Sequence, residues 1–194
     1  MSIGNVLLIG LSLFTAGSLS AQPKSSETPK LQGDTLKSTK ILVAYYSRTG
    51  TTRQAATELA ALLGADVEEI TDTKNRRGFF GYLGGGRDAS GKKTTVIGPL
   101  QKDPAEYDLV VLATPVWAWT VTPAMRTYLM QTKGKIRKAA FLCTMGGSGD
   151  VKTFAAMEEI SGLKPAATIS FKTAEVKNGQ HTQRLKNFAD QLLK

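Results

Sequence analysis

At 194 residues and 41% hydrophobic content, the sequence holds enough apolar material for one ordinary core and suits a single domain of typical size. Its single cysteine and single histidine exclude an intrachain disulfide and a Cys/His zinc cluster. The formal net charge of +9 favours acidic partners, anionic lipid surfaces or nucleic acid. The basic residues are scattered, however, and no aromatic residue interleaves with the densest run, KGKIRK at 133–138, so we expect a solvated basic face and no nucleic-acid site.

The chain opens with a segment that carries no charged side chain. Residues 1–20 hold an apolar run from Val6 to about Ala16, which is too short to span a bilayer because a spanning helix takes about 20 apolar residues. Small residues follow, so we interpret 1–20 as a secretory signal peptide cut near Ser20, although no Lys or Arg precedes the run. The alternatives are an uncleaved anchor or a start placed too early. The interpretation predicts a periplasmic or secreted protein with no stable membrane span.

Residues 21–39 are polar and lack apolar periodicity, which is typical of a disordered linker, and we expect the folded domain over 40–194. Four short apolar runs in this domain predict strands that are buried on both faces, as in a parallel sheet covered by helices. These runs are 41–46, 109–114, 139–144 and 166–171, and a weaker fifth, 65–70, alternates as an edge strand does.

The spacing of apolar residues between the strands predicts helices over 51–64, 122–131, 149–162 and 182–193. Strand and helix therefore alternate five times. This pattern predicts an α/β protein with a doubly wound, five-stranded parallel sheet in a three-layer sandwich. Ligands of such sheets bind beyond the carboxyl ends of the strands, so we expect the functional residues in the loops that follow the strands.

The first loop, after the first predicted strand, combines hydroxyl groups with a glycine at the start of a helix. Its hydroxyls and backbone amides can donate to phosphate oxygens, its glycine lets the backbone approach closely, and its arginine can add a charge-assisted contact. Its residues are Ser47, Arg48, Thr49, Gly50, Thr51 and Thr52. We expect a phosphate-binding loop, although an N-capping turn that binds no ligand has a similar sequence.

The second loop, after the third predicted strand, carries the only two tryptophans of the chain, where a parallel sheet has no core to fill. Its residues are Thr114, Pro115, Val116, Trp117, Ala118 and Trp119. Aromatic faces at this position can stack on a large flat ring system. The alternative is that one or both rings only cover the helix below.

The third loop, 144–150, follows the fourth predicted strand and is rich in glycine. Thr144, Gly146 and Gly147 are its candidate binding residues, because glycines let backbone amides approach a ligand edge or the neighbouring loop. Taken alone, a glycine-rich turn before a helix is a weak signal.

Together the three loops resemble those of the flavodoxin family, and the resemblance extends from about Lys40 to the C-terminus. The first loop matches the family's hydroxyl-x-Thr-Gly-x-Thr pattern at Ser47, Thr49, Gly50 and Thr52. The resemblance implies a flavodoxin-like fold that binds FMN, with the phosphate in the first loop and the isoalloxazine ring between the second and third. The sequence differs from well-known flavodoxins in its basic charge and in having no aromatic residue in the third loop.

The resemblance further implies an FMN-binding redox protein that transfers electrons or reduces a small acceptor, with no acid–base catalytic residue and no metal. Its partners would be a redox protein or a small-molecule electron acceptor, with NAD(P)H as a candidate reductant, and the choice between carrier and reductase stays open. One alternative is a non-catalytic protein of the same fold that holds another phosphorylated or aromatic ligand. Another is a membrane-surface or polyanion-binding role driven by the positive charge.

The stretch 75–100 separates the second and third predicted strands and contains GRDASGKK at 86–93, one residue short of a P-loop signature. Because this segment runs into TTVIGP rather than opening a helix, we do not expect nucleotide hydrolysis. We interpret the stretch as a mobile, basic cover near the flavin, packed down by Phe79, Phe80 and Tyr82.

The two residue types that occur once are expected to be structural. Cys143 ends an apolar run, which predicts a buried thiol at a strand end. His181 precedes the last predicted helix in a polar segment, where we expect a surface position.

Overall fold

The computed structural model describes residues 39–76 and 78–194, so the signal peptide predicted for 1–20 and nearly all of the predicted linker lie outside the described residues. Within this described part, no helix is both long enough and apolar enough to cross a membrane. The first strand, β1 (Ile41–Tyr45), begins at the start of the first predicted apolar run.

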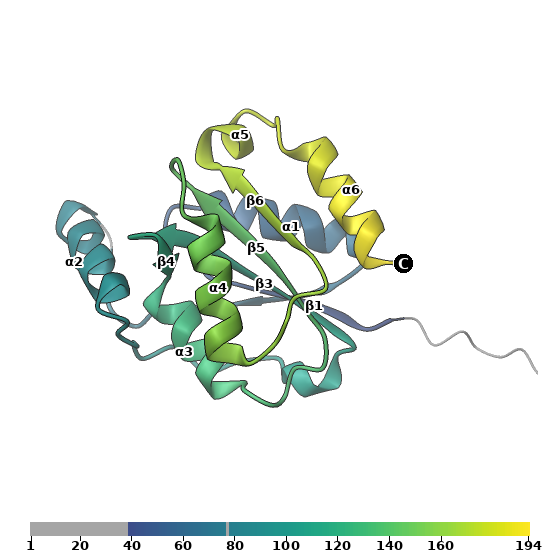
Figure 1. Cartoon of the computed structure of the whole chain (residues 1–194), viewed down its shortest axis with the longest axis horizontal. Coiled ribbons are helices and arrows are strands. Elements are labelled where there is room, and N and C mark those ends of the chain that lie inside the picture. Colours follow the sequence, from purple (N-terminus) through teal and green to yellow (C-terminus); the bar gives the residue numbers. More distant parts are fainter. Residues whose placement is uncertain (1–38, 77) are drawn as a thin grey trace, which may run out of the picture. The chain divides into compact units, whose positions relative to one another are not determined.

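A parallel sheet runs through the centre of the described fold (Figure 1). Its other parallel strands are β2 (Asp66–Glu69), β3 (Leu109–Trp117), β5 (Ala139–Met145) and β6 (Thr168–Lys172). They follow the order β2-β1-β3-β5-β6, so the chain moves outward from β1 to β2 and then returns past β1 to β3. This reversal is a topological switch point, and it confirms the doubly wound, five-stranded parallel sheet predicted from the sequence.

Helices cover both faces of the sheet and complete the three predicted layers (Figure 1). On one face lie α1 (Thr51–Leu63), the short α5 (Thr173–Lys177) and α6 (Thr182–Leu192), which share one hydrophobic cluster with the sheet. On the other face lie α3 (Pro123–Gln131) and α4 (Asp150–Ser161), which share a second cluster. A short 3-10 helix, Pro104–Glu106, leads into β3.

The residues of β1 explain why its sequence is apolar throughout. Side chains alternate along a strand, so Ile41 and Val43 enter the cluster under α1, whereas Leu42 and Ala44 enter the cluster under α3. All four side chains are buried. A strand that is covered on both faces has no position for a polar side chain, and this produces the continuous apolar run.

Two elements differ from the sequence predictions. The stretch interpreted as a mobile, basic cover contains a 13-residue helix, α2 (Gly78–Ser90), in which five of the residues are glycine. Glycine weakens a helix by about 1 kcal/mol per residue relative to alanine, which is why the sequence did not indicate a helix. In addition, β3 extends to Trp117 and pairs in antiparallel register with the two-residue strand β4 (Thr120–Val121).

The position of His181 is a third difference from the sequence predictions, because its side chain is only 1% exposed rather than on the surface. Its Nε2 lies 2.6 Å from Oε2 of Glu58 on α1, and its ring packs edge-on against Phe171. A carboxylate from a distant part of the chain therefore gives one nitrogen of this buried ring a hydrogen-bond partner. Cys143 is fully buried in β5, as predicted, and burial raises the pKa of its thiol.

Candidate functional site

The first loop connects β1 to α1 at the switch point and leaves the start of the helix without a side-chain cap. Gly50 occupies the N-cap position with φ 93°, a left-handed conformation that glycine adopts without strain. The Ser47 hydroxyl accepts a hydrogen bond from the Gly50 amide at 3.2 Å, and no acidic residue lies in the first turn of α1. The free amides of this turn can therefore bind an anion.

Threonine hydroxyl groups at the base of the three loops form hydrogen bonds with one another and with Thr122. Thr52 of the first loop and Thr144 of the third share a hydrogen bond of 2.7 Å between their Oγ1 atoms, and both side chains are buried. Thr114 shares a 3.1 Å hydrogen bond with Thr122, which caps the start of α3. Three of the threonines predicted to bind ligand thus form structural hydrogen bonds, and the bond between Thr52 and Thr144 holds the first loop against the third.

The tip of the β3–β4 hairpin carries backbone strain. Ala118 and Trp119 form its two-residue turn and have φ values of 46° and 59°, where glycine or asparagine is the usual choice. A left-handed conformation costs a non-glycine residue roughly 1–2 kcal/mol. The Trp119 ring nevertheless stays 62% exposed, so the turn presents an indole to solvent rather than burying it. Strained residues of this kind are concentrated at binding sites.

The two tryptophans of the second loop have different environments. Trp117 packs inward: its ring lies edge-on against Tyr46 at 5.7 Å, and the Arg76 guanidinium lies 5.9 Å from its centroid. A Cβ atom at Gly85 of α2 would come within 2.6 Å of the same ring, so this glycine allows α2 to approach. Trp117 is therefore packed against neighbouring side chains and half-buried, whereas Trp119 is the more exposed of the two rings.

The third loop lies directly beneath the hairpin tip. A Cβ atom at Gly149, which has φ 115°, would approach a side-chain methyl of Val116 to 2.8 Å and the Trp119 Cα to 3.1 Å. Gly146 and Gly147, in contrast, face open space. Sequence reasoning named these two glycines and missed Gly149, although a third glycine just before the helix was visible in TMGGSGD.

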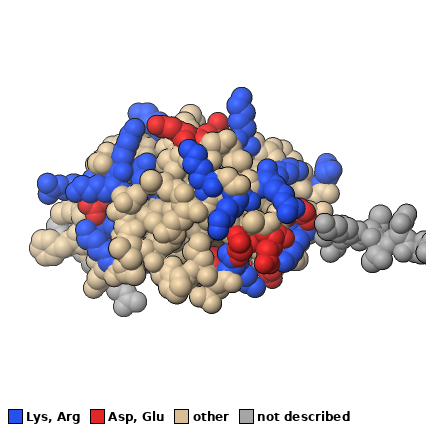
Figure 2. Space-filling model, turned by 90° about the horizontal axis from the view of Figure 1, so that it is seen from below, with Lys and Arg blue, Asp and Glu red and all other residues tan. Residues whose placement is uncertain are grey.

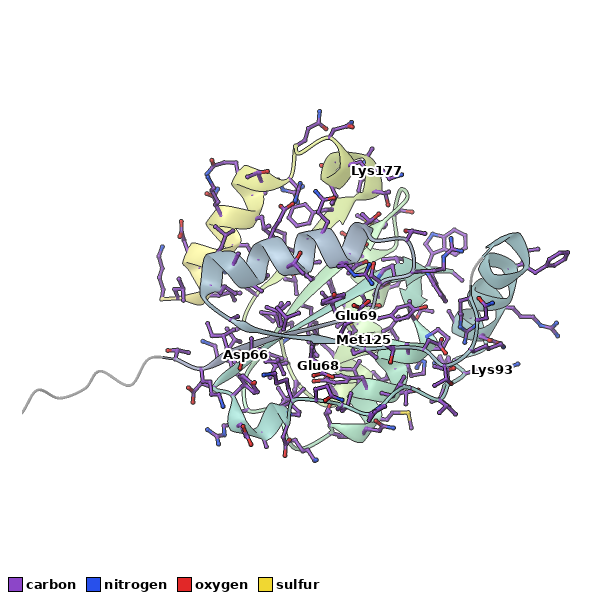
Figure 3. All side chains as sticks on the ribbon, turned by 180° about the vertical axis from the view of Figure 1, so that it is seen from behind. Asp66, Glu68, Glu69, Lys93, Met125 and Lys177 are labelled. Carbon is purple, nitrogen blue, oxygen red and sulfur yellow. The ribbon has the colours of Figure 1, made fainter. Side chains whose placement is uncertain are left out.

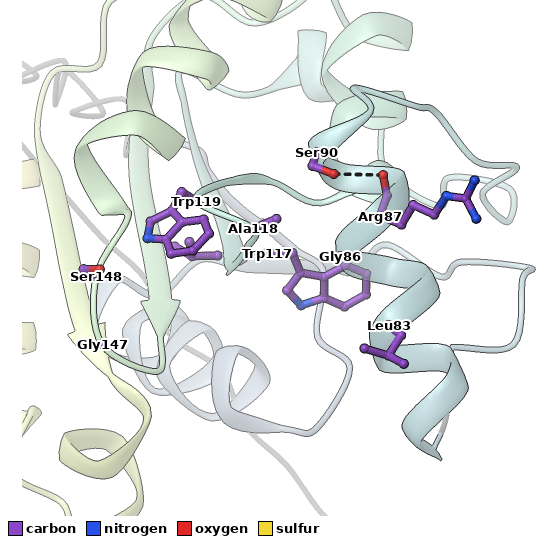
Figure 4. Close-up of a pocket in the computed structure, with 10 residues that line it drawn as sticks. Leu83, Gly86, Arg87, Ser90, Trp117, Ala118, Trp119, Gly147 and Ser148 are labelled. Carbon is purple, nitrogen blue, oxygen red and sulfur yellow. Dashed lines mark hydrogen bonds between the residues drawn. The ribbon is translucent and has the colours of Figure 1, made fainter.

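A cavity of about 640 Å³ opens between the hairpin tip, the third loop and α2 (Figure 4). Its lining comprises Leu83, Gly86, Arg87, Ser90, Val116, Trp117, Ala118, Trp119, Gly147 and Ser148. Five of these were predicted from sequence. The α2 residues were not predicted as cavity residues because α2 was not recognised as a helix. Ser148, which lies between Gly147 and Gly149, was not predicted either.

The first loop does not line this cavity. Ser47 and Arg48 instead line a smaller cavity of about 330 Å³, together with Tyr46 and Arg76. Burial, together with the nearby Asp72 carboxylate, raises the pKa of Tyr46 to about 12, so this ring between the cavities stays neutral. The structure thus brings the second and third loops together at one cavity and joins the first loop to them through the Thr52–Thr144 hydrogen bond.

A buried ion cluster fastens α2 to the segment after β2. Arg76 donates to Asp72 and to Asp88 of α2, each at 2.7 Å, and Lys74 donates to Asp88 at 2.9 Å. The hydrogen bonds from Lys74 and Arg76 lower the pKa of Asp88 to about 2. The Arg76 carbonyl also accepts a hydrogen bond from Arg48, so the cluster reaches the first loop. Within residues 39–76 and 78–194, no group of three His, Cys, Asp or Glu side chains could hold a metal ion.

Comparisons with known proteins support the fold. No protein-family model matches the sequence, and no curated protein matches it significantly. A flavoprotein from Lactobacillus acidophilus, solved in complex with FMN, matches with a TM-score of 0.60 and 22% identity over 72% of this chain and 97% of its own. Putative flavoproteins from Bacteroides uniformis and Bacteroides eggerthii match with TM-scores of 0.59 and 0.57, at 22% and 21% identity. These two matches each cover 74% of this chain, and 99% and 97% of their own chains.

The chain is therefore a protein of flavodoxin-like fold, as the sequence resemblance predicted. The matched segments cover nearly the whole length of each of these three structures, so the likeness extends over the complete domain of the relatives.

Proposed function

We propose that the protein binds FMN at the carboxyl edge of its sheet and carries electrons through it. One observation supports this proposal above the others. The first turn of α1 has no side-chain cap and can bind an anion, and the exposed Trp119 indole lies at the mouth of a neighbouring cavity. The likeness to the L. acidophilus flavoprotein, which was solved with FMN, supports the same ligand.

Each part of the site suits a different part of this ligand. The amides and hydroxyls of residues 47–52 would hold the phosphate, and the helix dipole of α1 adds to that attraction. The Trp119 ring would cover one face of the isoalloxazine, while Gly146 and Gly147 leave room for backbone amides to approach its edge. Bound FMN would supply reversible uptake of one or two electrons.

The cavity lining indicates what the protein itself contributes. Its polar side chains are Arg87, Ser90 and Ser148, and none of the lining residues is a carboxylate or an imidazole. The residues therefore bind, orient and exclude water rather than move protons. A redox partner protein or a small-molecule acceptor would exchange electrons at the cavity, with NAD(P)H as a candidate reductant. The charge-free N-terminal segment supports export to the periplasm or beyond.

The test compares FMN with riboflavin, which has the same ring but no phosphate, by titrating each into the full chain while following flavin and tryptophan fluorescence. We expect FMN to bind at least about tenfold more tightly, a difference of about 1.4 kcal/mol. The Ser47→Ala, Thr49→Val double variant should remove most of that difference, whereas Trp119→Ala should weaken both ligands alike.

Thr57→Val provides the matched control. Thr57 is an exposed threonine on α1, and its hydroxyl is bonded only to carbonyls of its own helix turn. Its variant should leave both affinities unchanged. Failure of the parent chain to bind FMN would contradict the proposal and favour a non-catalytic protein with another ligand.

A further inference from the structure

The smaller cavity, of about 330 Å³, is separate from the cavity assigned to the flavin ring. Its walls are residues 46–48 after β1, Arg53 in the first turn of α1, and most of residues 69–76 at and after the end of β2. We call it the β2-side cavity. Glu69, which belongs to its lining, lies below α1 in Figure 3. Tyr46 lines this cavity and Trp117 the larger one, so the edge-on contact of these two rings separates them.

Cations outnumber carboxylates in the β2-side cavity. Four arginine and lysine side chains line it together with two carboxylates. A third carboxylate, Asp88, accepts hydrogen bonds from two of these cations, and counting it still leaves an excess of positive charge. The larger cavity, in contrast, has one arginine and no carboxylate in its lining. The β2-side cavity is therefore the more polar of the two, and its charge favours an anion. The four cations are Arg48, Arg53, Lys74 and Arg76.

Ion pairs fix most of these cations before a ligand arrives. Arg53 pairs with Glu69, and Lys74 pairs with Asp88 at 2.9 Å. The Arg76 side chain is buried and donates from Nε and Nη1 to two aspartates, whereas its Nη2 has no hydrogen-bond acceptor within the described chain. Groups that are already held in place lose little conformational freedom when they bind a ligand.

The Tyr46 hydroxyl is a second donor without a partner. The Tyr46 side chain is only 5% exposed, and no described residue forms a hydrogen bond with its hydroxyl. Burial raises the pKa of this hydroxyl, Asp72 raises it further, and Arg76 and Arg48 lower it. These three charged residues all line the β2-side cavity, so the hydroxyl lies on that side of the ring. Buried polar groups rarely lack a partner, and this one therefore points to a ligand in the cavity.

We propose that the β2-side cavity is a second anion site, which binds the phosphate group of a phosphomonoester other than FMN. A phosphate group carries a charge of about −1.5 to −2 at pH 7 and has three strong acceptor oxygens. The Tyr46 hydroxyl, the Lys74 ammonium and Nη2 of Arg76 would donate to these oxygens from two separate segments of the chain. Inorganic phosphate and the 2′-phosphate of NADPH share this chemistry, and the experiment below distinguishes them.

The phosphate of FMN would occupy a different place. Of the first-loop residues 47–52, only Ser47 and Arg48 line the β2-side cavity, whereas Gly50 and the three threonines do not. FMN has a single phosphate, and its ring is assigned to the larger cavity on the other side of the Tyr46–Trp117 contact. A phosphate held by the amides at the start of α1 would leave the β2-side cavity open to a second ligand.

The test titrates inorganic phosphate into the full chain loaded with FMN and follows binding by calorimetry, with chloride at the same ionic strength as the reference. We expect a Kd of about 1 mM or below. Tyr46→Phe keeps the ring against Trp117 and removes only the hydroxyl, so it should weaken phosphate binding at least about threefold. Lys74→Met should weaken it at least about tenfold, because charge-assisted hydrogen bonds are stronger than neutral ones.

Two matched variants make the same chemical changes outside the cavity. Tyr107→Phe removes a hydroxyl from another buried tyrosine, one that donates to Asp66. Lys102→Met removes a lysine that pairs with the same aspartate. Neither residue lines the β2-side cavity, and each variant should change phosphate affinity less than about twofold, because salt screens distant exposed charges. Equal losses in the cavity variants and in these controls would overturn the proposal.

A comparison of NADP⁺ with NAD⁺, which lacks the 2′-phosphate, identifies the source of the phosphate group. Binding of NADP⁺ at least about tenfold tighter than NAD⁺, with the preference lost in Lys74→Met, would assign the site to a reductant of the flavin. Equal affinities for the two dinucleotides, with inorganic phosphate still bound, would assign it to free phosphate or a small phosphomonoester.

The remaining outcomes separate this inference from the proposed function. Phosphate binding that FMN abolishes would overturn the inference, because it would place the FMN phosphate in the β2-side cavity. A chain that binds FMN but no inorganic phosphate would also overturn it and leave the proposed function standing. Phosphate binding that Lys74→Met weakens, in a chain that binds no FMN, would keep the anion site and contradict the proposed function.

Discussion

The first loop and the hairpin tip lie at the same edge of the sheet but are built in different ways. The first loop reaches its left-handed position with a glycine, Gly50, so its conformation costs little. The hairpin tip places two non-glycine residues, Ala118 and Trp119, in the same left-handed region of φ, where their backbone is strained. One half of the candidate site therefore forms from local sequence, whereas the other half needs support from the rest of the molecule.

That support comes from parts of the chain far from the hairpin in sequence. Gly149 lets the third loop lie under the tip, and Gly85 lets α2 lie against Trp117. The Arg76 guanidinium lies 5.9 Å from the centroid of the same ring and holds α2 through Asp88. Removing these supports should disturb the conformation of the hairpin tip and leave that of the first loop unchanged.

Arg76→Met should have the largest effect. It leaves Asp72 and Asp88 buried without their main cation, and breaking a buried pair costs about 3–5 kcal/mol. Chemical denaturation measures the loss, and tryptophan fluorescence should shift because Trp117 loses its neighbouring guanidinium. Arg137→Met, which removes an exposed partner of Asp108, is the control and should cost less than about 1 kcal/mol. Similar losses of unfolding free energy in both variants would contradict the conclusion that Arg76 holds α2 in place.

Acid should weaken the same support. The pKa of Asp88 is about 2 in the folded protein, below the value of about 3.9 for a free aspartate. Its contribution to stability is therefore fully present above about pH 4 and is lost as the pH falls toward 2. Thermal unfolding between pH 2 and 7 should show a steeper acid decline for the parent than for Asp88→Asn. Parallel curves would indicate that this carboxylate is not held by Lys74 and Arg76.

Gly50→Ala tests the first loop. No atom lies within 4 Å of the new Cβ, so the cost is conformational alone and should be about 1 kcal/mol, with weaker FMN binding. Gly84→Ala is the matched control: this glycine of α2 also faces open space but is helical, so alanine should stabilise by about 0.5–1 kcal/mol. Denaturant midpoints that move in the same direction for both variants would refute this account.

Ala118→Gly should have the smallest effect and the opposite sign. Relief of left-handed strain is partly offset by the larger entropy of glycine in the unfolded chain, so the net gain should be below about 1 kcal/mol. FMN affinity should nevertheless fall, because a looser turn no longer fixes Trp119. Ala118→Val, which places a β-branched residue at φ 46°, should instead lower the melting temperature. A loss of stability in the glycine variant would mean that the turn is not strained.

The sequence predicted those parts of the molecule whose structure is set by neighbouring residues. Strands buried on both faces appear as apolar runs, and the first loop shows its hydroxyls and its glycine within six residues. The helix α2 could not be predicted because its five glycines oppose helix formation, and the contacts that compensate, with Trp117 and with Arg76 through Asp88, come from other parts of the chain. The burial of His181 depends on Glu58, 123 residues away, and no local pattern reveals such a pair.

The charge of the surface follows the prediction of scattered basic residues. Figure 2 shows Lys and Arg side chains spread over the face seen from below, with Asp and Glu among them. The uneven pairing of these charges was not predictable, because it depends on which carboxylates find partners in the folded chain.

The buried thiol in β5 is a natural probe of local unfolding. Cys143 is the only thiol of the chain and lies between β3 and β6, so a thiol reagent reaches it only when the central sheet opens. The rate of its modification under native conditions therefore reports how often this sheet opens. A single cysteine introduced on the surface would in turn accept a label at one defined position while the native thiol stays protected.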